Sequence, residues 1–407
     1  MKRGLVLGIL IAAFSVSMAI GGAQAPLAVP SAEALAATKI ERVKDNLYII
    51  TGSGAGAPNA FSGGNTAVFI TDAGVVLVDT KLPGWGQAIL DRVKTVTNKP
   101  VVTVINTHTH VDHTGSNEFF GTRVNSVVHE NTKANMATMD NFKGDRARFL
   151  PKSAFKDKIT LGSGKDEIDL YYFGAGHTNG DTFVVFPALR TMHVGDLFTD
   201  KQLPAIDFRY GGSAVAHPQT LAKAIANIKN VDTIINGHSP VSTWDDLKEY
   251  ADFSQDFVTW AQSEMKAGRT VDQAAGDYEL PARFKGYRIR VNEQIASVRT
   301  NLQRVYDELM PPPERKEVTL APEILTKYTG TYVIPGLGDA VVTREGDQLM
   351  MDPSGALQKF PLFAESETRF FFKVPVNGYL EFVKDENGIV THFLLYMGGA
   401  GQRGTRK

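Results

Sequence analysis

The hydrophobic pattern of residues 40–245 alternates between two kinds of segment. Short runs rich in β-branched residues, such as residues 101–105, are typical of buried strands, whereas residues 87–97 carry apolar side chains at helical spacing. Strands interleaved with helices predict a layered α/β domain. Further strands are expected at 47–51, 66–71, 75–79, 124–129, 158–161, 167–173, 182–194 and 231–235, and further helices at 131–139 and 218–228.

The pattern changes after this domain. Residues 246–310 are expected to form a helical extension, in which apolar residues recur every three or four positions from 291 to 309. This stripe predicts a helix docked on the main domain, with homodimerisation through the stripe as the alternative. Three prolines open a linker over 311–319, and residues 320–407 alternate short strands with turn residues, which predicts a small all-β C-terminal domain.

The first 25 residues have the pattern of an export signal. A basic start precedes a long apolar run, and Ala23 and Ala25 give the small-x-small pattern of a cleavage site. Cleavage after Ala25 would leave a flexible lead-in over residues 26–39 and a periplasmic or secreted protein without stable membrane association. An uncleaved membrane anchor is the alternative, although the apolar run is short for a span of about 20 residues.

Composition narrows the chemistry. A length of 407 residues suggests about two or three domains, and a formal net charge of −1 does not favour nucleic acid as a partner. The sequence contains no cysteine, which excludes thiolate metal ligands, catalytic thiols and disulfides. A metal site would need histidine and carboxylate ligands, and the expected partner is a small-molecule substrate.

The strongest candidate for chemistry is residues 107–115, Thr-His-Thr-His-Val-Asp-His-Thr-Gly. An apolar strand precedes them, so His108 and His110, two positions apart, can leave the strand on the same side. Asp112 and His113 fall where the strand gives way to a turn and a helix start. Nitrogen and oxygen ligands this close together are typical of a zinc site.

Three more candidate ligands follow apolar strands. His177, Asp196 and His238 each lie at a strand end beside glycine or a turn, where open α/β layers place their sites. The other histidines are interpreted as packing or surface residues, namely His129, His193, His217 and His392.

The ordered motifs His-x-His-x-Asp-His, Gly-His-Thr-x-Gly-Asp, Gly-Asp and Gly-His resemble the metallo-β-lactamase superfamily of binuclear metallohydrolases. The resemblance covers about residues 40–250 and implies a four-layer αββα sandwich of two mixed sheets with outer helices. It also implies two Zn²⁺ ions, with Fe or Mn as alternatives. The implied ligands are His108, His110 and His177 for one ion and Asp112, His113 and His238 for the other, with Asp196 bridging both.

The same resemblance implies a mechanism. A hydroxide bridging two ions about 3.5–4 Å apart would attack the substrate, with Asp112 as the group that accepts its proton. Asp79 and Asp181 would support the ligands from outside the ligand shell. Asp196 resembles the bridging aspartate of glyoxalase-type thioesterases, lactonases, phosphodiesterases and other esterases, and among these the expected substrate is a carboxylic ester, lactone or thioester.

Other functions stay open. Hydrolysis of β-lactams is the second hypothesis, an iron-dependent oxidoreductase is the hypothesis from another class, and a non-catalytic metal-binding protein is the third. The tail resembles the small β modules appended to secreted β-lactamase-like serine hydrolases, through Tyr-x-Gly-x-Tyr at 328–332 and three phenylalanines at 370–372. It is expected to cover the active site or to mediate association, including homodimerisation.

The substrate pocket is expected beside the glycine-rich loop over residues 52–64, with Phe61 as an apolar wall. Lys201, Arg209 and Tyr210 follow the Asp196 strand and either line the pocket or lie on a solvated loop. The ligand motifs are not surrounded by a cluster of Arg and Lys, so a phosphodiester is less favoured than a carboxylic ester.

Overall fold

The computed structural model describes residues 29–52, 58–291, 293, 296–310, 314–335, 338–353, 359–373, 378–397 and 402–407. The export signal expected at 1–25 therefore lies outside the described residues. Among the described helices, none is both long enough and apolar enough to cross a membrane.

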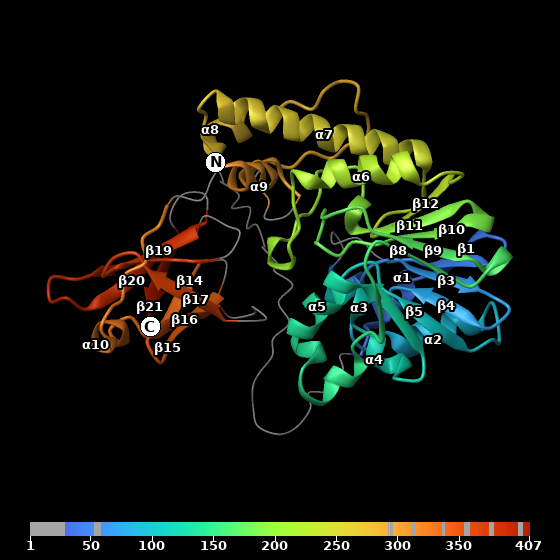
Figure 1. The fold of residues 1–407 in the computed structure, drawn as a ribbon, viewed down its shortest axis with the longest axis horizontal. Helices are drawn as coiled ribbons and strands as arrows, with labels where there is room; N and C mark the ends of the chain where they lie inside the picture. The colour runs from blue at the N-terminus through green and yellow to red at the C-terminus, as the bar shows by residue number, and fades with distance from the viewer. Residues whose placement is uncertain are drawn as a thin grey trace, which may run out of the picture.

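Two mixed sheets form the centre of the main domain (Figure 1). The seven-stranded sheet contains, in spatial order, β1 (Ile40–Lys44), β2 (Leu47–Ile50), β3 (Thr66–Ile70), β4 (Val75–Val78), β5 (Val101–Ile105), β6 (Asn125–His129) and β7 (Ser153–Phe155). The six-stranded sheet contains β13 (Ser242–Thr243), β12 (Thr233–Asn236), β11 (Thr191–Gly195), β10 (Phe183–Phe186), β9 (Ile168–Tyr171) and β8 (Lys158–Leu161). Pairing is parallel from β4 to β7 and between β11 and β12, and antiparallel elsewhere.

Helices cover the outer faces of both sheets (Figure 1). The helices of this domain are α1 (Ala32–Ala37), α2 (Gly86–Lys94), α3 (Val111–Thr114), α4 (Asn117–Phe120), α5 (Glu130–Thr138) and α6 (Ala216–Asn227). Val76 of β4 and Val184 of β10 lie in the core between the sheets, whereas their neighbours Val75 and Phe183 pack with α2 and α6, respectively. Burial on both faces explains the nearly continuous apolar strands. The predicted αββα sandwich is confirmed.

A helical extension follows, made of α7 (Trp244–Lys266), α8 (Val271–Ala275) and α9 (Val298–Leu309). The helix expected over 291–309 is shorter at its start, because a capping box between Ser297 and Thr300 begins α9 at Val298. Leu302 and Val305 are fully buried in the core that also contains side chains of α6 and α7. The described part of the stripe is therefore docked on the main domain.

The lead-in expected to be flexible over residues 26–39 is partly helical. Ser31 caps α1 by accepting a hydrogen bond from Ala34 N at 3.0 Å, and Ala34 is buried in the core under α2. Arg92 of α2 donates to the carbonyl oxygen of Leu35 at 2.7 Å. The end of the lead-in therefore belongs to the folded domain, which corrects the expectation.

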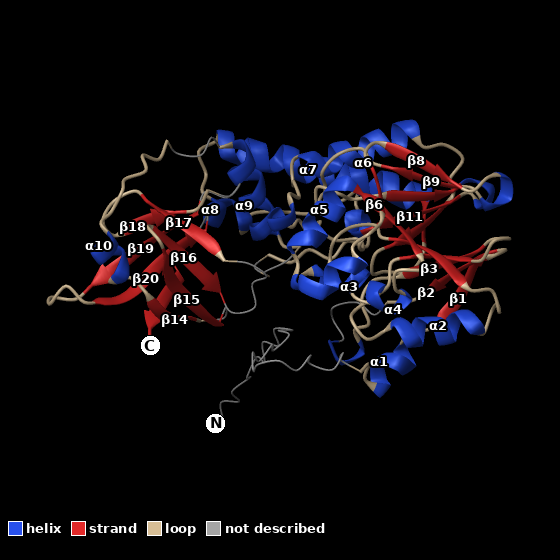
Figure 2. Cartoon of the chain, turned by 60° about the horizontal axis from the view of Figure 1, so that its bottom comes forward, coloured by secondary structure: helices blue, strands red, loops and turns tan. Residues whose placement is uncertain are grey.

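The C-terminal domain is a closed eight-stranded barrel, which lies to one side of the sandwich (Figure 2). After the short helix α10 (Pro322–Thr326), its strands are β14 (Gly330–Ile334), β15 (Gly338–Glu345), β16 (Gln348–Pro353), β17 (Phe360–Ala364), β18 (Arg369–Phe371), β19 (Gly378–Lys384), β20 (Val390–Met397) and β21 (Gln402–Arg406). Phe382 lies at the centre of its aromatic core, with ring centroids of Tyr328, Tyr332, Phe370 and Phe393 at 4.5, 5.8, 5.6 and 5.9 Å. The predicted all-β domain is confirmed.

Replacing Phe382→Ala is expected to destabilise the barrel by about 3–5 kcal/mol, because it removes a buried ring and leaves a cavity. Hydrogen-exchange mass spectrometry should show faster exchange in β14–β21 and unchanged protection in β1–β13, since the barrel has a hydrophobic core of its own. The control is Val341→Ala, at a side chain that is 38% exposed. Equal loss of protection in both domains would contradict the separation of the two cores.

Candidate metal centre

The seven predicted ligands come from loops and short helices that follow strands of both sheets. His108 and His110 lie between β5 and α3, and Asp112 and His113 lie within α3. The structure brings the seven side chains into two adjoining groups whose ligand atoms lie within 4.8 Å of one another. The first group is His108, His110, His177 and Asp196, and the second is Asp112, His113 and His238.

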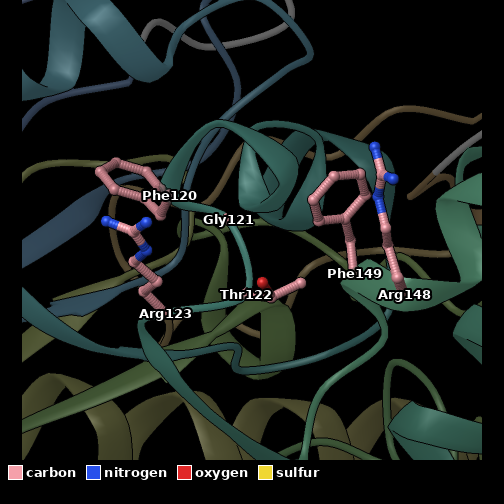
Figure 3. Close-up of a pocket in the computed structure, with 6 residues that line it drawn as sticks. All are labelled: Phe120, Gly121, Thr122, Arg123, Arg148 and Phe149. Atoms are coloured by element: carbon pink, nitrogen blue, oxygen red, sulfur yellow. The ribbon is translucent and has the colours of Figure 1, made fainter.

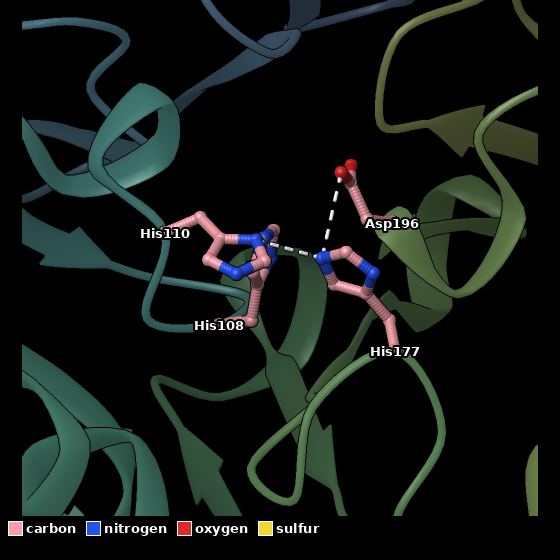
Figure 4. A group of neighbouring side chains, drawn as sticks. All are labelled: His108, His110, His177 and Asp196. Atoms are coloured by element: carbon pink, nitrogen blue, oxygen red, sulfur yellow. Dashed lines mark hydrogen bonds and ion pairs between the residues drawn. The ribbon is translucent and has the colours of Figure 1, made fainter. Parts of the chain in front are cut away.

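Three ring nitrogens converge in the first group (Figure 4). His110 Nδ1 lies 3.2 Å from His108 Nε2 and 2.8 Å from His177 Nε2. Lone pairs of unprotonated nitrogens repel each other at this separation, so a cation between them would stabilise the arrangement.

The second group has the same character. His113 Nε2 and His238 Nε2 are 3.2 Å apart, and Asp112 Oδ2 lies 3.2 Å from His238 Nε2 and 3.6 Å from His113 Nε2. Two imidazoles and a carboxylate are a donor set that suits a divalent cation.

Asp196 lies between the two groups. Its Oδ2 is 3.7 Å from His177 Nε2 and 3.3 Å from His238 Nε2, and its Oδ1 is 3.3 Å from His113 Nε2. Oδ1 is buried without a hydrogen-bond partner among the described residues. A buried carboxylate oxygen left in this way fits a cation as its missing partner. The residues present therefore fit divalent metal ions.

Asp79 orients the seven-stranded-sheet side of the centre. Its Oδ2 accepts hydrogen bonds at 2.7 Å from both His113 Nδ1 and Thr107 Oγ1, and its Oδ1 accepts from Thr107 N at 2.8 Å. Thr107 Oγ1 in turn lies 3.0 Å from His108 Nδ1. Both imidazoles thereby present Nε2 to the centre, which is the supporting role predicted for Asp79.

Asp207 orients His110, and no sequence motif indicated it. Its Oδ2 accepts a hydrogen bond from His110 Nε2 at 2.9 Å, so His110 presents Nδ1 to the centre. Arg209 holds this carboxylate through Nη2 at 2.8 Å. The carbonyl oxygen of Ala205 accepts from His177 Nδ1 at 2.5 Å. Ala205 and Asp207 lie in a loop without a motif, so their sequence carried no signal.

Asp181, the other predicted support, acts on the backbone. It accepts hydrogen bonds from Thr178 N at 2.9 Å and Thr178 Oγ1 at 2.6 Å, and so stabilises the bend that carries His177. Burial raises the pKa of Asp181 to about 6.

The four predicted pocket residues are placed differently. The Phe61 ring stacks on His238 at 5.8 Å, and the Tyr210 ring meets His110 edge-on at 5.6 Å. Arg209 contacts two residues that touch His110, bonding Asp207 and placing its guanidinium carbon 5.8 Å from the ring centroid of Tyr210. Lys201 is instead held by two carboxylates of α7, Asp246 at 3.0 Å and Glu249 at 2.9 Å, and is not placed at the centre.

Lys81 is a second residue near the centre that no sequence motif indicated. Its side chain is fully buried, and its ammonium group donates to the carbonyl oxygens of Gly64 at 2.7 Å and Thr51 at 2.9 Å. Burial lowers its pKa to about 7. The bond to Gly64 holds this backbone against the ring of His113, where an added Cβ would overlap the imidazole.

The remaining histidines lie outside both groups. Three of them use Nε2 to donate to backbone carbonyl groups at 2.8–3.2 Å, and the fourth lies beside Thr391 in the barrel. They are His129, His193, His217 and His392.

A separate surface cavity of about 380 Å³ lies between the end of α4 and the segment before β7 (Figure 3). It is lined by Phe120, Gly121, Thr122, Arg123, Arg148 and Phe149. None of these residues belongs to either metal group, so the cavity is distinct from the centre.

The carboxylates of the centre favour protonation of the histidines to which a metal ion would bind. Burial opposes a charge on His238, yet Asp196 and Asp112 raise its pKa to about 9. Burial likewise opposes charge on His113, whose pKa the same two carboxylates raise. Despite burial, the neighbouring histidines lower the pKa of Asp112 and Asp196. A metal ion must therefore displace protons from the imidazoles.

The chain shares a domain with known proteins. Residues 60–238 match the family model of the metallo-beta-lactamase superfamily, and residues 314–406 match a domain of unknown function, DUF3471. The chain is 28% identical over 243 residues to metallo-beta-lactamase type 2 of Elizabethkingia meningoseptica, covering 56% of this chain and 88% of that protein. It is 28% identical over 200 residues to metallo-beta-lactamase IND-1 of Chryseobacterium indologenes, covering 48% and 80%.

Solved structures agree with this assignment at the level of fold. The sec-alkylsulfatase Pisa1 from Pseudomonas sp. matches with a TM-score of 0.54 and 16% identity, over 71% of this chain and 56% of that one. Residues 60–238, which contain all seven candidate ligands, therefore form a metallo-β-lactamase superfamily domain, as the resemblance implied.

Metal binding is expected to release protons and to strengthen as the pH rises. In the metal-free protein at pH 7, His238 holds a proton because its pKa is about 9. A metal ion that displaces this proton is expected to bind about tenfold more tightly for each pH unit gained, up to about pH 9. Calorimetric Zn²⁺ titrations at pH 7 in two buffers of different ionisation enthalpy measure the release. His392→Gln, in the barrel, should leave it unchanged. Affinity that is independent of pH would be inconsistent with these charges.

Gly64→Ala is expected to impair the second group selectively, because the new Cβ would overlap the His113 ring. Metal analysis should show one divalent ion lost and one retained, or a second-ion affinity reduced about 10–100-fold. Gly276→Ala is the matched control, since nothing lies within 4 Å of its added Cβ. Unchanged binding of both ions in Gly64→Ala would show that this contact does not position His113.

Proposed function

We propose that this metal-dependent hydrolase of the metallo-β-lactamase superfamily uses two Zn²⁺ ions to cleave a carboxylic ester, lactone or thioester. The observation that carries the proposal is the position of Asp196, whose two carboxylate oxygens lie within 3.7 Å of histidines of both groups. A carboxylate in the bridging position resembles the thioesterases, lactonases, phosphodiesterases and other esterases of the superfamily.

The side chains of the centre would have two roles, which are metal binding and proton transfer. When bound, the metal ions would supply Lewis acidity and lower the pKa of a coordinated water. Asp112 is the proposed proton acceptor, because its carboxylate is 19% exposed, compared with 9% for that of Asp196. The ligands would be His108, His110 and His177 for one ion, Asp112, His113 and His238 for the other, and Asp196 for both.

The surroundings support a substrate without a phosphate group. Phe61 and Tyr210 place aromatic rings beside His238 and His110, and could hold an apolar acyl or alkyl group. The cations near the centre among the described residues are already bound: Arg209 by Asp207, and Lys81 by backbone carbonyl groups.

Hydrolysis of a β-lactam is the second candidate. It is favoured by the names of two relatives, both metallo-beta-lactamases, that share 28% identity with this chain. The bridging Asp196 speaks against it, because β-lactamases of the superfamily generally lack a carboxylate there. Iron-dependent oxidation and metal binding without catalysis are the candidates from other classes, because the ligands alone do not select a metal.

We further propose export of the protein to the periplasm or the medium. The basic start, apolar run and small-x-small pattern of residues 1–25 support it. Homodimerisation through the C-terminal module remains a proposal, whereas the described apolar stripe of α9 is already covered within the chain.

The Zn²⁺-loaded chain is expected to hydrolyse an ester, lactone or thioester faster than any β-lactam, phosphodiester or alkyl sulfate in a common panel. The Asp112→Asn variant should lower kcat by about 10²–10⁴-fold on the best substrate, because it removes the proton acceptor. Metal content of the variant is measured in parallel, since Asp112 is also a proposed ligand.

Three results would overturn the proposal. Faster turnover of a β-lactam would favour the second candidate, and oxygen consumption by the iron-loaded protein would favour an oxidoreductase. Full activity and full metal content in Asp112→Asn would remove both roles of Asp112. Val341→Ala, at the 38% exposed position in the barrel, is the control for nonspecific effects of substitution.

A further inference from the structure

One loop supplies the hydrogen-bond acceptors for the ring nitrogens of two ligand histidines that point away from the centre. It connects the turn at Asp196–Phe198 with α6, and it contains Ala205 and Asp207. Ala205 O accepts from His177 Nδ1 at 2.5 Å, and Asp207 Oδ2 accepts from His110 Nε2 at 2.9 Å. The loop between residues 199 and 215 therefore decides which nitrogens these imidazoles present.

This loop is held from outside the matched domain, by α9. Asn301 Nδ2 donates to the carbonyl oxygen of Pro204 at 3.0 Å, one peptide unit before Ala205. At the far end of the loop, Glu308 accepts hydrogen bonds from Ser213 Oγ at 2.5 Å and Ala214 N at 2.6 Å. Two side chains of one helix thus fix both ends of the segment that contains Asp207.

A third contact lies between these two. The guanidinium carbon of Arg304 lies 4.3 Å from the ring centroid of Phe208, the residue directly after Asp207. Asn301, Arg304 and Glu308 are spaced three and four residues apart, so they line one face of α9. This face is polar and meets the loop, while Leu302 and Val305 of the same helix enter the hydrophobic core.

The polar face of α9 holds the loop through specific hydrogen bonds as well as through packing. Asn301 is 3% exposed, and its Nδ2 donates to Ser297 O at 3.1 Å as well as to Pro204 O, so losing the Pro204 bond would leave one buried N–H without its acceptor. Losing that bond would free the backbone next to Ala205 and, through it, the ring of His177. Movements of about 1 Å at a ligand are enough to weaken metal binding.

We propose that α9 is a positioning element of the first metal group, acting on His177 and His110 through Asn301, Arg304 and Glu308. The inference rests on the proposed metal-dependent function, and extends the centre to a helix about 60 residues beyond the last ligand. In this view the helical extension is part of the machinery that holds the metal.

The test compares Asn301→Ala with Leu302→Ala in the full chain. Asn301→Ala is expected to weaken binding of one of two Zn²⁺ ions about 10–100-fold, and to change the visible absorption of the Co²⁺-loaded protein. Leu302→Ala should lower the midpoint of thermal unfolding but leave metal affinity and the Co²⁺ spectrum unchanged, since its side chain faces the core. In a His177→Ala background, Asn301→Ala should have a smaller effect on metal affinity than in the wild-type background.

Equal effects of Asn301→Ala and Leu302→Ala on metal affinity would overturn the inference, because loss of stability alone would then explain both. Unaltered affinity in Asn301→Ala would also overturn it and leave the proposed function standing. A wild-type chain that binds no divalent ion would overturn the proposed function as well.

Discussion

The crowding of unprotonated nitrogens and carboxylate oxygens in a buried place is the constraint on which the rest of the structure depends. His108, His110 and His177 bring three ring nitrogens to separations of about 3 Å, and Asp196 adds an oxygen without a hydrogen-bond partner. Such an arrangement is stable only with positive charge between the groups, whether protons or metal ions. Each imidazole is therefore fixed from behind by an acceptor or a packed ring, so that the repulsion cannot turn it away.

This constraint also explains the sandwich. The seven-stranded sheet supplies His108, His110 and the α3 ligands, whereas the loops of the six-stranded sheet supply the other three, so neither sheet can assemble the centre alone. Asn65 joins the two halves, because its backbone N donates to Gly237 O at 2.7 Å and its Nδ2 donates to Asn236 O at 2.8 Å. The hydrophobic core between the sheets and this polar bridge act together, because each group takes ligands from both sheets and opening the sandwich would divide both groups.

What the sequence could predict follows from where the information lies. Period-two and helical patterns are local, so the layers, the helical extension and the all-β tail could be predicted from them. The spacing of His108, His110 and His113 is local as well, and it indicated a metal site. Asp207 and Lys81 act through contacts that only the folded chain creates. Asp207 bonds His110, 97 residues away in the sequence, and Lys81 bonds the backbone of Gly64 across a loop. The start of α9 was misplaced because apolar spacing continues before Ser297, whereas the capping box, not the stripe, sets the first helical residue.

The boundary of a family domain need not be the boundary of its site. Residues 60–238 contain every candidate ligand, yet the atoms that orient His177 and His110 lie in a loop whose two ends are bonded to α9. A ligand histidine with a free second nitrogen could rotate, and the entropy of that freedom would oppose metal binding. By ordering the loop, a helix that contributes no ligand reduces this cost, so changes within the extension can tune the centre while its ligands stay the same. Relatives that share the ligand motifs but differ after His238 can therefore differ in metal affinity for a structural reason that their motifs do not reveal.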